Sequence, residues 1–212
     1  MRRTLHGLYA ITPDEPDTAI LAEKVRQALL GGVSVVQYRN KTADASLRHK
    51  QANTLLQLCR EARVPLIVND TLTLACDIAA EGLHLGDKDG DLPAARAQLG
   101  GNKLLGASCY NRIDLALVAQ AAGADYVAFG AAFPSRTKSA AVHAPLALFR
   151  EARQRLDIPI VAIGGITPEN ALSLIDAGVD AIAVISALFD AHDIEATARH
   201  FSNLFRQPVH HE

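Results

Sequence analysis

IDAGVDAIAVI, residues 175–185, nearly repeats QAAGADYVAFG, residues 120–130. Each stretch reads as the end of a helix, a glycine that caps it, an acidic residue in a turn and a buried apolar strand. Helices that alternate with strands in this way form βα units, whose strands pair in parallel within one sheet. The two stretches therefore predict an α/β protein with a parallel sheet.

The same alternation of strand and helix patterns extends outward over the whole chain. The apolar runs expected to be strands are residues 8–11, 33–38, 66–68, 82–85, 104–107, 126–129, 160–163 and 181–185. The amphipathic segments expected to be helices are residues 16–30, 44–63, 71–80, 92–99, 112–122, 146–156, 168–177 and 187–205. Since no linker divides the 212 residues, we predict a single (β/α)8 TIM barrel over residues 1–212, with residues 206–212 as a flexible tail. A doubly wound open sheet is the main alternative.

The composition excludes several classes of function. The net charge of −2 and the lack of a basic stripe argue against nucleic-acid binding, and no apolar run approaches the roughly 20 residues that span a membrane. The basic N-terminus is not followed by the apolar segment of a signal peptide. Three well-spaced cysteines favour a reducing compartment over a disulfide framework. We therefore expect a cytoplasmic protein that binds small molecules, and the sequence leaves open whether it forms a homo-oligomer.

Polar residues that follow the second predicted strand are candidates for ligand binding, because the active sites of such barrels lie at the carboxyl ends of the strands. Gln37, Arg39 and Lys41 stand at alternate positions, so their side chains are expected to point the same way. One amide and two cations suit an anionic ligand. A solvated turn explains this triplet about equally well when it is taken alone.

Acidic residues follow the third and fourth predicted strands. Asp70 comes after Asn69, and Asp87, Asp89 and Asp91 come after the fourth strand. An aspartate at such a position often caps a helix. Carboxylates on two adjacent strand ends that face cations favour Mg²⁺, which is bound by one or two carboxylates together with water and substrate phosphate oxygens. Spacing alone does not choose among Asp87, Asp89 and Asp91.

The loops after the later strands complete this face. Residues 130–144 form a long polar loop after the sixth strand, typical of a lid. Gly164-Gly165 and Ile185-Ser186 follow the seventh and eighth strands, where this fold commonly binds phosphate through backbone N–H groups. Ser108, after the fifth strand, either donates to a ligand or caps the next helix. The cations and the expected Mg²⁺ suit a highly charged group such as pyrophosphate, whereas the glycine cradle suits a monophosphate. No Ser-His-Asp group, activated cysteine or acid–base pair is visible. The simplest chemistry is therefore loss of pyrophosphate from one substrate and capture by a second, phosphorylated substrate.

The chain resembles the thiamine-phosphate synthases from GLYAIT at residues 7–12 to Ile185-Ser186. The motifs that carry the resemblance are Gln37-x-Arg39-x-Lys41, Asn69-Asp70, GLHLGxxD at residues 82–89, FPSxTK at residues 133–138 and IGGI at residues 163–166. The resemblance implies that a hydroxymethylpyrimidine pyrophosphate loses pyrophosphate. It also implies that the ring nitrogen of thiazole phosphate traps the resulting carbocation and gives thiamine phosphate.

The resemblance further implies a role for each motif. The residues expected to hold the pyrimidine pyrophosphate are Gln37, Arg39, Lys41, Asn69, Ser108 and Lys138, of which Arg39, Lys41, Ser108 and Lys138 are the expected catalytic residues. Asp70 and Asp89 are expected to bind Mg²⁺, which resolves the choice among the acidic residues. The residues expected to hold the thiazole phosphate are Ser135, Arg136, Thr137, Gly165, Ile185 and Ser186.

Some positions depart from the commonest pattern of the family. Gly130-Ala131-Ala132 replaces a usual Gly-Pro, Ser135 stands where threonine is common, and Tyr38 stands where a smaller aliphatic residue is common. The segment after Ser108 also lacks a frequent histidine. These changes bear on loop geometry, whereas the charged groups are kept.

Two other functions are weighed against the transferase. Thiazole tautomerases share this barrel and its thiazole-phosphate cradle, but they need no pyrophosphate site. The charged residues that favour the transferase over such an isomerase are Arg39, Lys41, Asp70, Asp89 and Lys138. A non-catalytic ligand sensor is the third function considered, and the sequence offers no extra domain for signalling.

Overall fold

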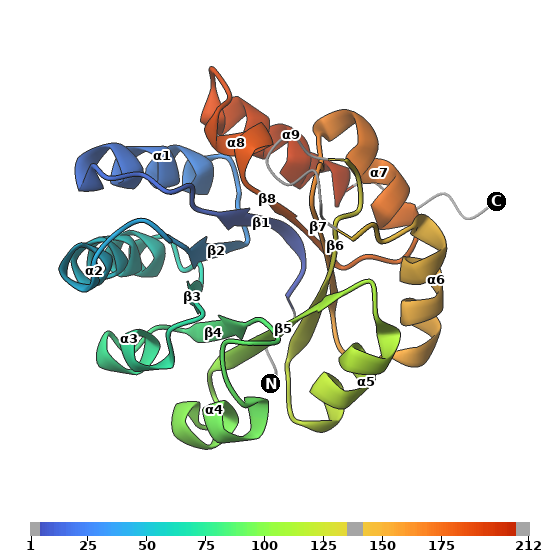
Figure 1. Ribbon diagram of the computed structural model, residues 1–212. Coiled ribbons are helices and arrows are strands. Elements are labelled where there is room, and N and C mark those ends of the chain that lie inside the picture. The colour runs from blue at the N-terminus through green and yellow to red at the C-terminus, as the bar shows by residue number, and fades with distance from the viewer. Residues whose placement is uncertain (1–4, 135–141, 207–212) are drawn as a thin grey trace.

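The structure is a computed structural model that describes residues 5–134 and 142–206, and it confirms the predicted barrel. The strands of this part of the chain pair in parallel in the order β1-β2-β3-β4-β5-β6-β7-β8 and close on themselves (Figure 1). They are β1 (Gly7–Ile11), β2 (Val35–Tyr38), β3 (Leu66–Asn69), β4 (Gly82–Leu85), β5 (Leu104–Tyr110), β6 (Tyr126–Gly130), β7 (Ile160–Ile163) and β8 (Ala181–Val184). The open-sheet alternative is wrong, because β1 pairs with β8.

Helices surround the barrel and lie between successive strands (Figure 1). They are α1 (Thr18–Leu30), α2 (Ala45–Glu61), α3 (Leu72–Asp77), α4 (Leu92–Leu99), α5 (Ile113–Ala121), α6 (Leu146–Arg155), α7 (Pro168–Asp176), α8 (Ser186–Phe189) and α9 (Ile194–Leu204). Within the described ranges, none of these helices is long and apolar enough to cross a membrane. Most of the observed bounds lie within a few residues of the predicted ones.

The helix predicted over residues 187–205 is an exception, because the structure divides it into α8 and α9. α8 ends at Phe189, and Asp193 begins α9 by accepting a hydrogen bond from the backbone nitrogen of Ala196 at 2.8 Å. An aspartate cap satisfies the free N–H groups of a new first turn and therefore competes with a continuous helix. The apolar periodicity continues across the break, which is why the sequence pattern suggested one helix.

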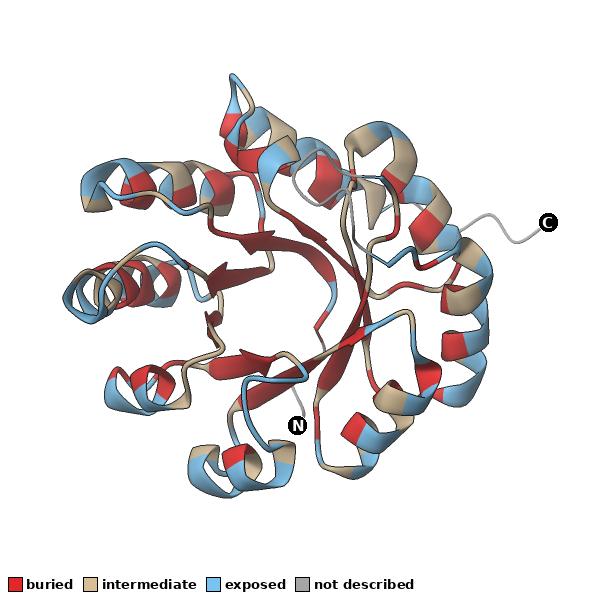
Figure 2. Ribbon diagram, in the orientation of Figure 1, coloured by how far each residue is buried: buried red, intermediate tan, exposed pale blue. Residues whose placement is uncertain are grey.

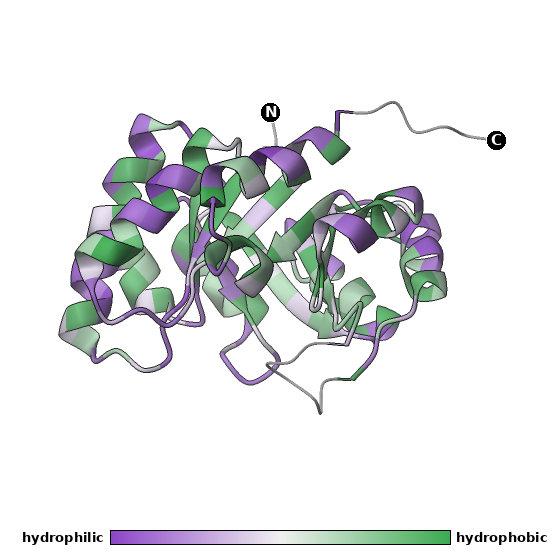
Figure 3. Cartoon of the chain, turned by 90° about the horizontal axis from the view of Figure 1, so that it is seen from above, coloured by the Kyte–Doolittle hydropathy of each residue, from purple (hydrophilic) through white to green (hydrophobic). Residues whose placement is uncertain are grey.

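The apolar core has two layers, one inside the barrel and one between the strands and the helices. Tyr9, Val35, Ile67 and Tyr126 belong to the inner layer, whereas the alternate strand residues belong to the outer one. The strands are buried along most of their length, apart from the exposed end of β5 at Tyr110, and the helices bury the side that faces the barrel (Figure 2). Hydropathy follows the same division, since the strands are mainly hydrophobic and the helices alternate (Figure 3). This core fixes the strand ends that carry the candidate site.

Candidate active site

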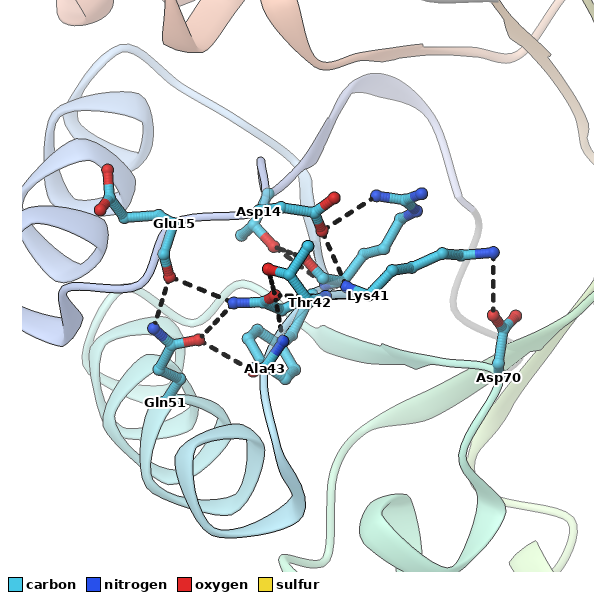
Figure 4. A network of polar contacts seen from close by, with 11 residues as sticks. Asp14, Glu15, Lys41, Thr42, Ala43, Gln51 and Asp70 are labelled. Atoms are coloured by element: carbon cyan, nitrogen blue, oxygen red, sulfur yellow. Dashed lines mark hydrogen bonds and ion pairs between the residues drawn. The ribbon is translucent and has the colours of Figure 1, made fainter.

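Charged side chains gather at the barrel mouth after β1 and β2. Asp14 accepts hydrogen bonds from the guanidinium of Arg39 at 3.2 Å and from the backbone nitrogen of Lys41 at 2.8 Å. The hydroxyl of Thr12 donates to the Arg39 carbonyl and accepts from the Arg39 nitrogen, each at 2.9 Å. These contacts tie the backbone of Arg39 and Lys41 to the residues after β1, and Figure 4 shows Asp14 beside Lys41. Gln37 lies within β2 and is buried in the barrel interior, where it donates to the Tyr9 hydroxyl.

Asp14 is a functional candidate that the sequence analysis missed. It lies 25 residues before Arg39 and follows Thr12-Pro13, directly after β1. The one available signal was its place after the first strand, because the carboxyl ends of all eight strands share one face. Asp14 supplies the negative charge that orients one cation and fixes the turn that carries the other.

The ends of β3 and β4 bring two carboxyl groups to the same edge. Lys41 Nζ lies 3.8 Å from Asp70 Oδ2, and the Asp89 carboxylate accepts a hydrogen bond from the Gly86 nitrogen at 3.0 Å. Burial raises the pKa of Asp70, the adjoining Asp89 raises it further, and Lys41 opposes the shift. Two neighbouring carboxylates repel each other, so a cation bound between them would be stabilised.

The structure also separates two of the three acidic residues that spacing left equivalent, Asp89 and Asp91. Asp91 accepts a hydrogen bond from the Ala94 nitrogen at 2.9 Å and so caps α4, whereas Asp89 faces Asp70. Asp70 lies one residue before Thr71, the N-cap of α3. In the described part of the chain, no three or more His, Cys, Asp or Glu side chains gather as a metal cluster. The pair formed by Asp70 and Asp89 nevertheless fits Mg²⁺, because this ion is usually held by only one or two carboxylates and completes its shell with water and phosphate oxygens.

A small cavity of about 210 Å³ lies beside Asp70, and Asp89 does not belong to its described lining. Its lining includes Lys41, Asn69 and Asp70, which the sequence analysis had singled out, and it also includes Arg48 of α2. The Nε atom of Arg48 is buried and has no hydrogen-bond partner among residues 5–134 and 142–206. Arg48 adds a third cation to this side of the mouth, and nothing in its helical sequence context indicated that.

Ser108 lies on β5 and faces the barrel interior rather than capping a helix. Its Oγ atom is 2.9 Å from Nε2 of His84, which belongs to β4. Burial lowers the pKa of His84 to about 4, so this ring is neutral near pH 7. Helix α5 begins instead after Arg112. The cap interpretation of Ser108 is thus excluded by its place in the strand.

The glycine-rich side of the mouth is a separate cavity of about 590 Å³. Its lining includes Gly164, Gly165, Ile185 and Ser186, so the structure brings the two predicted halves of the phosphate cradle together. Gly165 has a φ of +64°, and a Cβ atom there would lie 2.5 Å from the carbonyl oxygens of Phe133 and of the next residue. Only glycine lets the β7 and β6 loops approach this closely.

The remaining predicted residues belong to the loop after β6. Ser135, Arg136, Thr137 and Lys138 lie outside the described residues. The described edges of this loop are joined by backbone hydrogen bonds, because the Ala131 nitrogen donates to the Val142 carbonyl and the Ala144 nitrogen donates to the Ala131 carbonyl, each at 2.8 Å.

The fold and the site define a class: a (β/α)8-barrel protein whose mouth has a charged half and a glycine-lined half. The family model described as thiamine monophosphate synthase matches residues 8–188. The chain belongs to this family of transferases.

Individual relatives agree with this assignment. The thiamine-phosphate synthase of Methylobacillus flagellatus is 55% identical over 201 residues, which are 95% of this chain and 96% of the relative. That of Aromatoleum aromaticum is also 55% identical over 201 residues, which are 95% of this chain and 97% of the relative. The solved thiamine phosphate pyrophosphorylase of Pyrococcus furiosus superposes with a TM-score of 0.85 at 35% identity, covering 94% of this chain and 95% of that one.

Proposed function

We propose that this thiamine-phosphate synthase works through two substrate sites at one barrel mouth. A pyrimidine pyrophosphate occupies the charged half after β2–β5, and a thiazole phosphate occupies the cradle after β7 and β8. The observation that carries the proposal is the convergence of Arg39, Lys41, Asp70 and Asp89 on one side of the mouth, apart from the cavity at Gly165, whose lining holds one charged residue, Asp190, among the described residues. A thiazole-phosphate isomerase would need only the second half.

The charged half is suited to a leaving group that gathers negative charge. As the C–O bond to pyrophosphate breaks, its electron pair goes to the pyrophosphate oxygen, and Arg39 and Lys41 stabilise that charge. The residues proposed to hold this substrate are Gln37, Arg39, Lys41, Asn69, Ser108 and Lys138. A fixed donor or cation of this kind lowers the activation barrier by roughly 2.7–4 kcal/mol, by analogy with an oxyanion-hole donor.

Asp70 and Asp89 are the residues that would hold Mg²⁺. When bound, the ion supplies a positive charge that neutralises pyrophosphate oxygens. Asp70 is also placed to orient the Lys41 ammonium group, because the two charges lie 3.8 Å apart. The chain thus brings a carboxylate pair and two cations to the same leaving group.

The cradle is suited to the acceptor substrate. The residues proposed to hold thiazole phosphate are Ser135, Arg136, Thr137, Gly165, Ile185 and Ser186. Its ring nitrogen attacks the pyrimidine carbocation with a lone pair and forms the new C–N bond, so no proton needs to be removed. Because no proton has to be removed, the reaction needs no general base, and the sequence motifs contain no acid–base pair. Exclusion of water from the mouth would protect the cation until it is trapped.

The free thiols of Cys59, Cys76 and Cys109 support a cytoplasmic location for this chemistry.

A direct assay tests the proposed function. The purified protein is mixed with both substrates and Mg²⁺, and thiamine phosphate and pyrophosphate are measured together. We expect equal amounts of the two products and their loss when a chelator is added. Binding of both substrates without any product would reject the transferase reaction, and activity that persists fully with the chelator would reject the role of Mg²⁺.

A further inference from the structure

A row of polar side chains crosses the barrel interior beneath the mouth. Nε2 of Gln37 donates to the Tyr9 hydroxyl at 2.8 Å, and the hydroxyls of Tyr9 and Tyr126 are also 2.8 Å apart. Nδ1 of His84 lies 3.0 Å from the Tyr126 hydroxyl, and its Nε2 lies 2.9 Å from Ser108 Oγ. The row therefore joins two proposed ligand contacts, Gln37 and Ser108, through three residues that have no proposed contact with substrate.

The middle of this row is closed to solvent. Tyr9 is 1% exposed, Tyr126 is 0% exposed and His84 is 7% exposed. Burial raises the pKa of both tyrosines, so each hydroxyl keeps its hydrogen. A buried donor without an acceptor is costly, and so each hydroxyl hydrogen must find its place within the row.

The donation by Gln37 sets the direction of every later hydrogen bond. Because the Tyr9 oxygen accepts from Gln37, the Tyr9 hydrogen is free to donate to Tyr126. The Tyr126 hydrogen then goes to Nδ1 of His84, which accepts when the ring carries its hydrogen on Nε2. That Nε2–H group donates to Ser108 Oγ, so the Ser108 hydrogen remains for a ligand.

We propose that Tyr9, Tyr126 and His84 are positioning residues that fix the hydrogen-bonding direction of Gln37 and Ser108, and that they thereby select a pyrimidine with an amino group beside a ring nitrogen. The inference rests on the proposed function, since it concerns the pyrimidine substrate of that reaction. Gln37 keeps its amide oxygen as an acceptor for the ligand, and Ser108 keeps its hydroxyl as a donor.

The two ends match the chemistry of an aminopyrimidine. Its amino group is a donor for the Gln37 oxygen, and its neighbouring ring nitrogen is an acceptor for the Ser108 hydroxyl. An oxo analogue in its lactam form presents the reverse pair, a carbonyl acceptor and a ring N–H donor. A site that holds fixed donors and acceptors rejects the mismatched ligand, because buried polar groups are then left unpaired.

The barrel interior is built around the rings that carry this row. The rings of Tyr9 and Tyr126 meet edge to face at 6.0 Å, and His84 stacks on Tyr126 at 5.5 Å. A Cβ atom at Gly106 would lie 2.1 Å from the Tyr126 ring, so glycine at this strand position makes room for it. Replacing either tyrosine by phenylalanine keeps these ring contacts and removes only the hydroxyl.

The test measures kcat/KM for the aminopyrimidine pyrophosphate and for its 4-oxo analogue. In Tyr126→Phe and Tyr9→Phe we expect the preference for the amino substrate to fall roughly 3- to 10-fold, the scale of one or two lost hydrogen bonds. KM for the pyrimidine substrate should rise while KM for thiazole phosphate stays unchanged. The matched control is Ser202→Ala on α9, which loses a half-buried 2.9 Å hydrogen bond to the Gly32 carbonyl and should leave the preference unchanged.

A second pair of variants covers the case in which the tyrosine variants fail to fold. Glutamine at position 84 can accept from Tyr126 and donate to Ser108 through one amide, whereas leucine can do neither. His84→Gln should therefore retain more of the preference than His84→Leu. The inference would be overturned if folded Tyr126→Phe kept the wild-type preference for the amino over the 4-oxo substrate. It would also be overturned if His84→Gln and His84→Leu showed the same preference. An inactive wild-type protein would instead reject the proposed function itself.

Discussion

The two halves of the barrel mouth are built in opposite ways. After β2–β4, charged side chains are oriented by other charged side chains, as Asp14 orients Arg39 and Asp70 faces both Lys41 and Asp89. After β7 and β8, the cavity around Gly165 is lined mainly by glycine, alanine and aliphatic residues, with Asp190 as the one charged residue of its described lining. A backbone cradle suits any monophosphate, so many barrels could share it. In the proposed function, the charged half is what would make this mouth specific for a pyrophosphate leaving group.

The largest effect on the charged half is expected from Asp70→Asn combined with Asp89→Asn. Removing both carboxylates should lower kcat/KM by roughly 100- to 1,000-fold and abolish the dependence on Mg²⁺, because the pyrophosphate charge loses its main counter-ion. Affinity for thiazole phosphate should stay unchanged. Initial rates over a range of Mg²⁺ concentrations check this, and an unaltered Mg²⁺ dependence would reject the metal assignment.

The corresponding substitution in the glycine-lined cradle is Gly165→Ala. The added Cβ would clash with two loop carbonyls at 2.5 Å at a φ of +64°, so the cradle must widen or shift. We expect KM for thiazole phosphate to rise on the order of 10-fold, equivalent to about 1.4 kcal/mol. KM for the pyrimidine pyrophosphate should not change. Gly101→Ala is the matched control, because a Cβ there meets nothing within 4 Å. Equal effects on both substrates would contradict separate halves.

A smaller loss is expected from Asp14→Asn. This change removes the charge that orients Arg39 and weakens the hydrogen bond that fixes the Lys41 backbone. The turnover rate should fall roughly 3- to 10-fold, because the pair is partly exposed and solvent screens part of its energy. Asp114→Asn removes the partner of the exposed Arg112 at the start of α5 and serves as control. A steady-state assay with saturating Mg²⁺ compares the two, and matching rates would remove Asp14 from the mechanism.

The smallest expected effect concerns the stability of the fold, which should depend on pH through the buried His84. Burial holds the pKa of His84 near 4, below the ordinary 6.5, so the unfolded chain takes up this proton first as pH falls. The contribution of neutral His84 is therefore fully present above pH 6.5 and is lost towards pH 4, by at most about 1.4 kcal/mol per pH unit. Urea unfolding with a chelator at several pH values should show that His84→Gln lacks this part of the slope. Parallel curves for both proteins would contradict the shift.

Much of this contrast was readable from the sequence, because it depends on local patterns. The apolar runs placed every strand of the barrel, and Gly164-Gly165 after the seventh run placed the cradle. What remained hidden depends on residues far apart in the chain. Asp14 meets Arg39 across 25 positions, and Tyr9 meets Tyr126 across 117. No local period records such a contact, since only barrel closure brings the partners together.

The acidic residues show the same limit on a smaller scale. Asp87, Asp89 and Asp91 are the same residue type at neighbouring positions, and their spacing alone did not choose among them. The choice depends on where α4 begins, because Asp91 is used as its cap and Asp89 is left at the mouth. The break between α8 and α9 has the same origin, an aspartate cap at Asp193 inside a continuous apolar pattern.

The central claim is that the two halves bind their ligands independently, and calorimetry with wild-type protein tests it most directly. Inorganic pyrophosphate and thiazole phosphate are titrated separately and then each in the presence of the other, with and without Mg²⁺. We predict that pyrophosphate binds only with Mg²⁺ and leaves the affinity for thiazole phosphate unchanged. Displacement of thiazole phosphate by pyrophosphate, one for one, would contradict the account.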